Sequence, residues 1–165
     1  MREFVFLFIL SAGLVSFYLF RKKIFPGEKG LTPELERLMA DKADQYGVDR
    51  VLVKAIAKVE SNFNPRAKNP ADPSYGLMQI TPILAQDFNL VKDYRNPSPA
   101  EIERIYDLDN NLYVGCSQLA HLTRIRPFDS AVQMYNVGYT GYMNGVRNYD
   151  YLNKVRSYYE KYRSV

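Results

Sequence analysis

The chain has 165 residues, of which 47% are hydrophobic and 24% are charged, and these fractions exclude an intrinsically disordered protein. The formal net charge is +4, but residues 1–23 hold four basic residues and one acidic residue, so the rest carries only +1. A nearly neutral globular part does not indicate a nucleic-acid-binding protein. The lone cysteine and the lone histidine, Cys116 and His121, exclude an internal disulfide and do not make a transition-metal site.

The N-terminal segment is strongly apolar. Residues 4–20, with the sequence FVFLFILSAGLVSFYLF, contain no charge and are followed by the basic cluster Arg21, Lys22 and Lys23. As a helix they would span about 25 Å, close to the ~30 Å of a bilayer core. No small-residue cleavage site follows, so we expect a retained single-pass membrane anchor over residues 1–23. A signal peptide, cleaved or uncleaved, is the alternative.

Residues 24–31 are rich in glycine, proline and charge and predict a linker. Residues 32–165 then form the predicted domain, which begins with a helix capped by Thr32 and started by Pro33 and ends that helix at Tyr46 and Gly47. Apolar residues at helical spacing predict further helices, and no alternating run of strand length occurs. The sequence therefore predicts a mainly α domain with later helices at 48–61, 82–88, 99–106, 109–123, 128–135 and 151–162.

Glu60 lies at the end of the predicted 48–61 helix, four positions after Ile56 and on the edge of the apolar face. Partial burial disfavours the ionised carboxylate and raises its pKa, so a glutamic acid there can hold a proton near neutral pH. A general acid needs this property. The position of Glu60 alone fits a solvated glutamate at a helix end as well, and that case is the commoner one.

Three short elements occur in order along the domain. Glu60-Ser61 is followed by Asn64-Pro65, then by residues 76–82 (GLMQITP), and later by residues 131–138 (AVQMYNVG). This arrangement, which extends from about Leu35 to Tyr162, resembles the soluble lytic transglycosylase family of the lysozyme-like superfamily. The resemblance implies a lysozyme-like helical domain that cleaves peptidoglycan.

The resemblance also implies roles for individual residues. Glu60 would be the catalytic acid and base, Gln79 would face the cleft from a tight turn at Gly76, and Tyr135 would line the site near Glu60. The substrate-binding residues expected from it are Ser61, Asn69, Gln79, Tyr135, Asn136 and Tyr151. Departures from the family pattern are Val137 in place of alanine, and Gln133 with Met134 in place of small residues. These departures predict a reshaped groove wall.

The expected reaction needs one carboxylate. The acid protonates the oxygen between N-acetylmuramic acid and N-acetylglucosamine, and the muramic 6-hydroxyl then closes on C1 to give a 1,6-anhydro sugar. No metal or cofactor is implied. Two alternatives remain: a hydrolytic lysozyme-type muramidase, for which Asp72 and Asp87 offer no compelling second carboxylate, and a non-catalytic membrane-anchored structural or peptidoglycan-binding protein.

The expected partners are peptidoglycan glycan strands and a membrane through residues 4–20, with no nucleic acid. The basic cluster at residues 21–23 favours a cytoplasmic position for the domain, whereas peptidoglycan lies on the opposite side of a cell membrane. The protein would therefore act from a bacteriophage virion membrane or from a bacterial inner membrane facing the periplasm, with virion or secretion-complex proteins as further partners.

Overall fold

The computed structural model describes residues 28–164, and the chain divides into two units, residues 1–31 and residues 32–165. The predicted anchor, residues 1–23, lies outside the described residues. Among residues 28–164 no helix is both long enough and apolar enough to cross a bilayer. The description below concerns the second unit.

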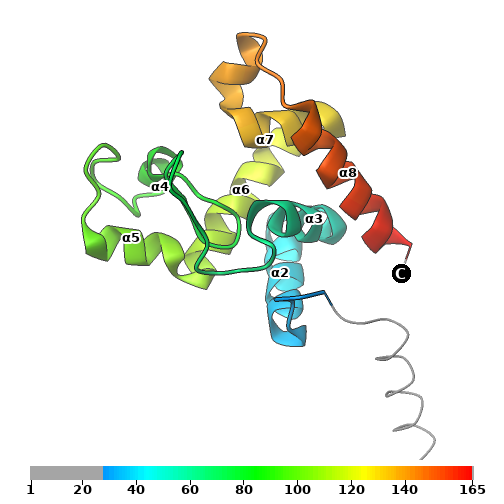
Figure 1. Cartoon of the computed structure of the whole chain (residues 1–165), viewed down its shortest axis with the longest axis horizontal. Helices are drawn as coiled ribbons and strands as arrows, with labels where there is room; N and C mark the ends of the chain where they lie inside the picture. Colours follow the sequence, from blue (N-terminus) through cyan, green and yellow to red (C-terminus); the bar gives the residue numbers. More distant parts are fainter. Residues whose placement is uncertain (1–27, 165) are drawn as a thin grey trace, which may run out of the picture. The chain divides into compact units, whose positions relative to one another are not determined.

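The second unit is mainly helical, as the sequence predicts, with one small β-hairpin (Figure 1). Two helices precede the hairpin and five follow it. In chain order the elements are α2 (Pro33–Tyr46), α3 (Arg50–Ser61), β1 (Lys68–Asn69), β2 (Ser74–Tyr75), α4 (Pro82–Asp87), α5 (Pro99–Tyr106), α6 (Leu108–Ile125), α7 (Phe128–Met143) and α8 (Tyr149–Arg163).

Side-chain caps set the helix ends. The Thr32 hydroxyl accepts a hydrogen bond from the Leu35 amide at 3.1 Å, and Gly47 ends α2 with a left-handed φ of 66°, so the predicted start and end of this helix are confirmed. The next helix starts two residues later than the predicted Val48, because the Asp49 carboxylate caps it by accepting the Val51 and Leu52 amides.

Helix α3 lies at the centre of the packing. Its fully buried residues include Val53, Ala55, Ile56 and Ala57, and it packs against both α2 and α8 (Figure 1). A helix buried on more than one side holds its backbone firmly, because opening it would expose apolar surface at about 25 cal/mol per Å². The C-terminal end of this rigid helix carries Glu60.

Two regions differ from the prediction. The 64–76 loop contains the antiparallel pair β1 and β2, whose two-residue strands are too short to produce an alternating pattern in the sequence. The helix predicted at 128–135 extends to Met143 as α7, but Gly138, at φ 73° and ψ 159°, interrupts it. Glycine adopts this backbone conformation without the steric cost that other residues meet.

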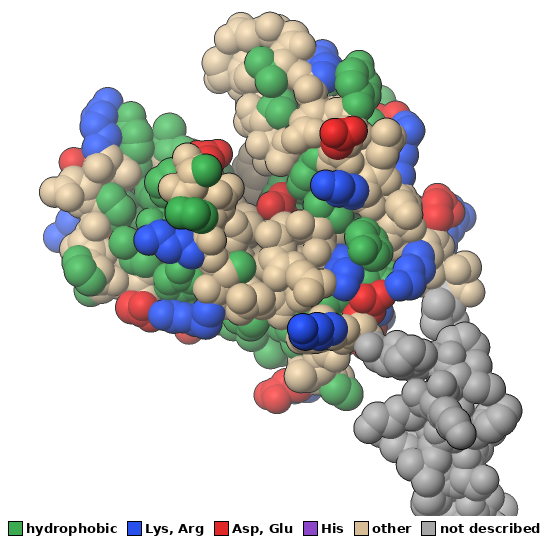
Figure 2. Space-filling view, in the orientation of Figure 1, with side chains coloured by type: hydrophobic (Ala, Val, Ile, Leu, Met, Phe, Trp, Pro, Cys, Tyr) green, Lys and Arg blue, Asp and Glu red, His purple; other side chains and the backbone are tan. Residues whose placement is uncertain are grey.

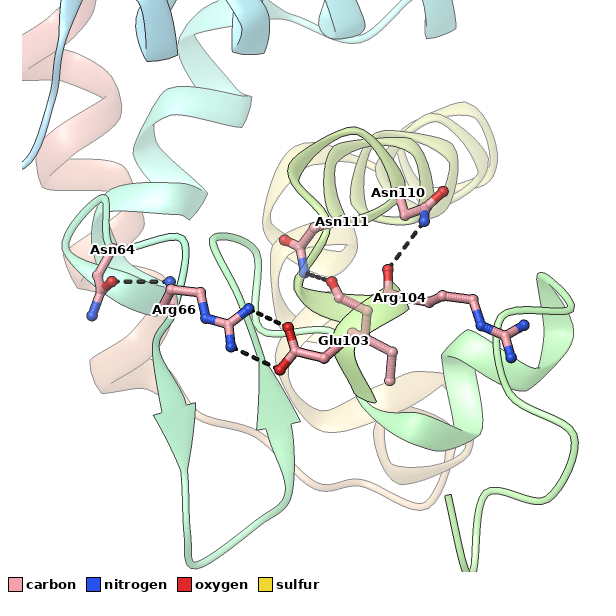
Figure 3. Close-up of polar contacts among 7 residues, drawn as sticks. Asn64, Arg66, Glu103, Arg104, Asn110 and Asn111 are labelled. Carbon is pink, nitrogen blue, oxygen red and sulfur yellow. Dashed lines mark hydrogen bonds and ion pairs between the residues drawn. The ribbon is translucent and has the colours of Figure 1, made fainter. Parts of the chain in front are cut away.

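A buried asparagine joins the hairpin to α5 and α6. Asn111 donates from Nδ2 to the carbonyls of Tyr75 and Ile105, both at 2.9 Å, and its Oδ1 accepts the Met78 amide at 2.8 Å. At the surface, the Arg66 guanidinium makes two hydrogen bonds to the Glu103 carboxylate, at 2.7 and 2.8 Å (Figure 3). These contacts fix the segment that carries Gln79 against the helices.

Candidate active site

A cleft of about 520 Å³ opens beside the C-terminal end of α3. Its walls come from the end of α3, the hairpin, the turn before α4, and α7, and Figure 2 shows the hollowed surface in this region. A second hollow, also about 520 Å³, runs along α4 and the C-terminal part of α7 and shares five residues with the first, so the two form one groove. The shared residues are Asp72, Gln79, Thr81, Tyr135 and Asn136.

Glu60 lines this cleft from the last turn of α3. The helix ends directly afterwards, because Asn62 and Phe63 adopt left-handed φ values of 53° and 62°, and Phe63 is buried. The backbone therefore turns away into the loop and leaves the Glu60 side chain at the edge of the cleft. The residue as a whole is partly buried and lines the open cavity.

The Tyr151 hydroxyl of α8 donates a hydrogen bond to Glu60 Oε1 at 2.5 Å. Burial of Glu60 raises the pKa of its carboxyl from the usual 4.5 to about 7, and the hydrogen bond from Tyr151 opposes this shift without cancelling it. The carboxyl thus exchanges its proton near neutral pH. Since Tyr151 occupies Oε1, the second oxygen is available to a substrate in the cleft.

Tyr135 lies in the same cleft, and its hydroxyl donates to the Met78 carbonyl at 3.0 Å. Burial, and secondly the nearby Glu60 carboxylate, hold the pKa of Tyr135 and of Tyr151 well above the ordinary range. Both phenols therefore remain protonated hydrogen-bond donors over the working pH range of Glu60.

Gln79 also lines the cleft, but its polar atoms are engaged within the protein. Its Nε2 donates to the carbonyls of Gly76 at 2.9 Å and Ala67 at 3.3 Å, and its Oε1 accepts from the Ser74 hydroxyl at 2.8 Å. With a φ of 50°, Gln79 holds the tight turn that the sequence places after Gly76. The structure thus places it as a brace of the cleft wall.

The remaining predicted residues occupy different parts of the site. Ser61 and Asn69 line the cleft, where the Ser61 hydroxyl donates to the Ala57 carbonyl at 3.0 Å and Asn69 Oδ1 accepts the Ala71 amide at 3.1 Å. Asn136 is an exposed cleft residue on α7. Tyr151 is buried at 6% exposure and contacts the cleft through Glu60.

Sequence reasoning assigned no site role to four residues that the structure brings to this region. Lys68, Asp72 and Ser74 line the cleft from the hairpin, and Asn148 caps α8 next to Tyr151. The hairpin gives no periodic pattern, so Lys68 and Ser74 were not singled out, and Asp72 was weighed only as a second carboxylate. For Asn148 a signal was present: an asparagine directly before a run of helical spacing is a preferred N-cap. Within the described residues no group of three or more histidine, cysteine, aspartate and glutamate side chains is placed to hold a metal ion.

Comparison with known proteins agrees with this geometry. Residues 37–156 match the family described as the transglycosylase SLT domain. The chain is 33% identical over 109 residues to membrane-bound lytic murein transglycosylase E of Buchnera aphidicola, covering 63% of this chain and 48% of that protein. It is 38% identical over 82 residues to membrane-bound lytic murein transglycosylase C of Sodalis glossinidius, covering 48% of this chain and 22% of that protein.

A solved structure shares the fold. The lytic transglycosylase Slt of Pseudomonas aeruginosa, in an inactive mutant form, superposes with a TM-score of 0.51 at 19% identity and covers 72% of this chain and 20% of that one. The mainly helical, lysozyme-like architecture predicted from the sequence is thereby confirmed. The chain spans about half or less of the length of the curated relatives named above.

Proposed function

The chain belongs to the transglycosylase SLT domain family, and from this membership and the environment of Glu60 we propose that it is a peptidoglycan lytic transglycosylase. The observation that carries the proposal is a single glutamic acid at the cleft, with a pKa near 7 and one carboxyl oxygen bound by Tyr151. A group with this pKa can both give and accept a proton at neutral pH.

In the proposed reaction Glu60 donates its proton to the glycosidic oxygen as the bond from that oxygen to C1 of N-acetylmuramic acid breaks. The resulting Glu60 carboxylate takes the proton of the muramic 6-hydroxyl, whose oxygen forms a new bond to C1. The products are a free 4-hydroxyl and a 1,6-anhydro sugar, and Glu60 is protonated again. The nucleophile belongs to the substrate, so its attack gains the advantage of an intramolecular reaction.

The structure supports a role for Tyr151 in both steps. Its hydroxyl stabilises the carboxylate that forms after proton donation, and it occupies only Oε1. The remaining proposed binding residues, Ser61, Asn69, Gln79, Tyr135 and Asn136, all line the cleft that contains Glu60, which supports glycan binding along it. Gln79 contributes as part of the cleft wall, since its amide is engaged within the protein.

Mass spectrometry of muropeptides released from purified peptidoglycan tests the proposal. Products that are one water lighter than reducing-end muropeptides are expected from the full chain and should be absent with Glu60→Gln. The matched control is Glu34→Gln, the same chemical change on the exposed surface of α2. Release of no product by a folded protein would contradict the proposal and favour a binding or structural role.

A hydrolytic muramidase is the second candidate, because Asp72 lines the same cleft as Glu60 and could activate water. The same experiment separates the two reactions. Reducing-end products that disappear with Asp72→Asn would establish hydrolysis, whereas anhydro products that persist with this variant would leave Glu60 as the one required carboxylate.

We further propose that residues 1–23 anchor the enzyme in a membrane, on the basis of the uncharged segment at 4–20 and its basic flank. The settings that fit are a bacteriophage virion membrane and a bacterial inner membrane facing the periplasm, with virion or secretion-complex proteins as partners. Two curated relatives are named as membrane-bound, which supports anchoring. Cell fractionation tests the anchor: the full-length protein should be found in the membrane fraction and residues 24–165 in the soluble fraction.

A further inference from the structure

Two side chains of α7 bind the same residue at the end of the segment that joins α7 to α8. Gln133 Oε1 accepts the backbone amide of Asn148 at 2.8 Å, and Asn136 Oδ1 accepts from Asn148 Nδ2 at 2.9 Å. Gln133 and Asn136 are three positions apart, so they lie on one face of the helix. Asn148 is thereby held on α7 through both its backbone and its side chain.

Asn148 also begins α8. Its Oδ1 accepts the Tyr151 amide at 3.0 Å and so caps the first turn of the helix. The side chain of the same tyrosine reaches Glu60 at 2.5 Å. Three hydrogen bonds, joined through the covalent frames of Asn148 and Tyr151, therefore link Gln133 to the carboxyl in the cleft.

We propose that Gln133 and Asn148 are positioning residues of the active site, which hold the first turn of α8 so that the Tyr151 hydroxyl stays on Glu60. This inference rests on the proposed function, in which Glu60 is the catalytic acid. Gln133 is one of the departures from the family pattern, and it does not line the cleft, so a reshaped groove wall does not explain it. Holding Asn148 gives this residue a role.

The burial of Gln133 supports this role over simple packing. Its side chain is 2% exposed, and Nε2 has no hydrogen-bond partner among residues 28–164. A buried amide with an unused donor costs free energy that an apolar residue of the same size would avoid. Among the described residues, the hydrogen bond that offsets this cost is the one from the Asn148 amide to Gln133 Oε1, so the position uses its acceptor.

The expected consequence follows from the titratable groups around Glu60. Tyr151 from α8 contacts its carboxyl, Tyr135 from α7 lies nearby, and Lys68 and Asp72 line the same cleft from the hairpin side. The hydrogen bond from Tyr151 favours the ionised carboxylate, so displacing Tyr151 raises the pKa of Glu60. In the bonds described above, Asn148 reaches Glu60 only by way of Tyr151.

The test is a double-mutant cycle read out by pH dependence. The fall of kcat/KM at high pH, its basic limb, reports the pKa of the group that must be protonated to act as the general acid. We expect Tyr151→Phe to move this limb upward by about one pH unit, which corresponds to the loss of one hydrogen bond to a charged group. Asn148→Ala should move it in the same direction by about 0.3 unit or more, and Asn148→Ser, which keeps a capping oxygen, should restore most of the wild-type profile.

In the Tyr151→Phe background, Asn148→Ala should produce no further shift. The matched control is Thr32→Ala, which removes the N-cap of α2 and should lower the melting temperature without moving the limb. If Asn148→Ala does not fold, Gln133→Met provides the same test, since it removes only the acceptor for the Asn148 amide. An unmoved limb, a downward shift, or an equal shift in both backgrounds would overturn the proposal.

Titration of the Glu60 carboxyl by carbon-13 NMR in the full chain separates this inference from the proposed function. A protein that releases no product from peptidoglycan, but whose Glu60 titrates at higher pH in Asn148→Ala, would retain the positioning role and lose the reaction. A protein that releases anhydro products with a Glu60 titration unaffected by Asn148→Ala would retain the reaction and lose the positioning role.

Discussion

Replacing Glu60 with glutamine should make the protein more stable at alkaline pH and leave its stability at acidic pH nearly unchanged. Burial raises the pKa of Glu60 in the folded protein from the usual 4.5 to about 7. Between these two pH values the folded state holds a proton that the unfolded state has released. The stability contributed by the protonated carboxyl is therefore complete below about pH 4.5 and is lost as pH rises through about 7.

The size of the effect follows from the same two values. At about 1.4 kcal/mol for each pKa unit, the rise from 4.5 to about 7 corresponds to about 3 kcal/mol. This is an upper value, because water in the open cleft can hydrate the ionised carboxylate. Glu60→Gln carries no titrating group, and its side-chain oxygen can still accept from Tyr151. The variant should thus gain up to about 3 kcal/mol over the wild type at pH 8.

Urea unfolding of both proteins at about pH 4.5, 6 and 8 measures the difference. Far-UV circular dichroism suits the assay, because the chain is mainly helical and contains no tryptophan. The free-energy difference should grow steadily with pH, while Glu34→Gln on the exposed part of α2 should show no comparable growth. A difference that is constant with pH, or larger in acid, would refute the assignment of a raised pKa to Glu60.

Three further predictions concern the scaffold around the cleft. Gly76→Ala should destabilise the fold by about 2 kcal/mol or more, measured by thermal unfolding, because φ is 82° and the new Cβ would lie 2.3 Å from Asn111 Nδ2; an unchanged melting temperature would contradict this. Glu101→Gln should destabilise the fold more at pH 7 than at pH 3, since hydrogen bonds from Ser98 and from the Lys92 amide lower the pKa of Glu101 to about 2. The stability that the Glu101 carboxylate contributes is present above about pH 4.5 and is lost as pH falls toward 2. Urea unfolding at both pH values checks the prediction. Cys116 should resist a thiol reagent at pH 8 until the protein unfolds, because burial raises its pKa to about 12, and fast labelling of the native protein would exclude this.

The sequence alone was sufficient to predict the helical class and to propose Glu60 as the acid. Thr32, Pro33 and Gly47 define a helix by local hydrogen bonds and backbone preferences, which depend on near neighbours in the chain. The position of Glu60 beside an apolar helix face predicted a raised pKa, and the structure agrees in direction and cause. The family resemblance, carried by Glu60, residues 76–82 and residues 131–138, was likewise available from the sequence, and the family match confirms it.

Only the tertiary structure decided which side chains form hydrogen bonds with these residues. Tyr151 lies 91 positions from Glu60 in the chain, and no local pattern indicates that its hydroxyl meets that carboxyl. Gln79 was expected to face the cleft, and only the tertiary structure shows that its amide also bonds Ser74, Gly76 and Ala67 in the cleft wall. Sequence periodicity reports which side of a helix is buried; the packing of α3 against α8 determines which side chain meets the acid and how tightly it holds its proton.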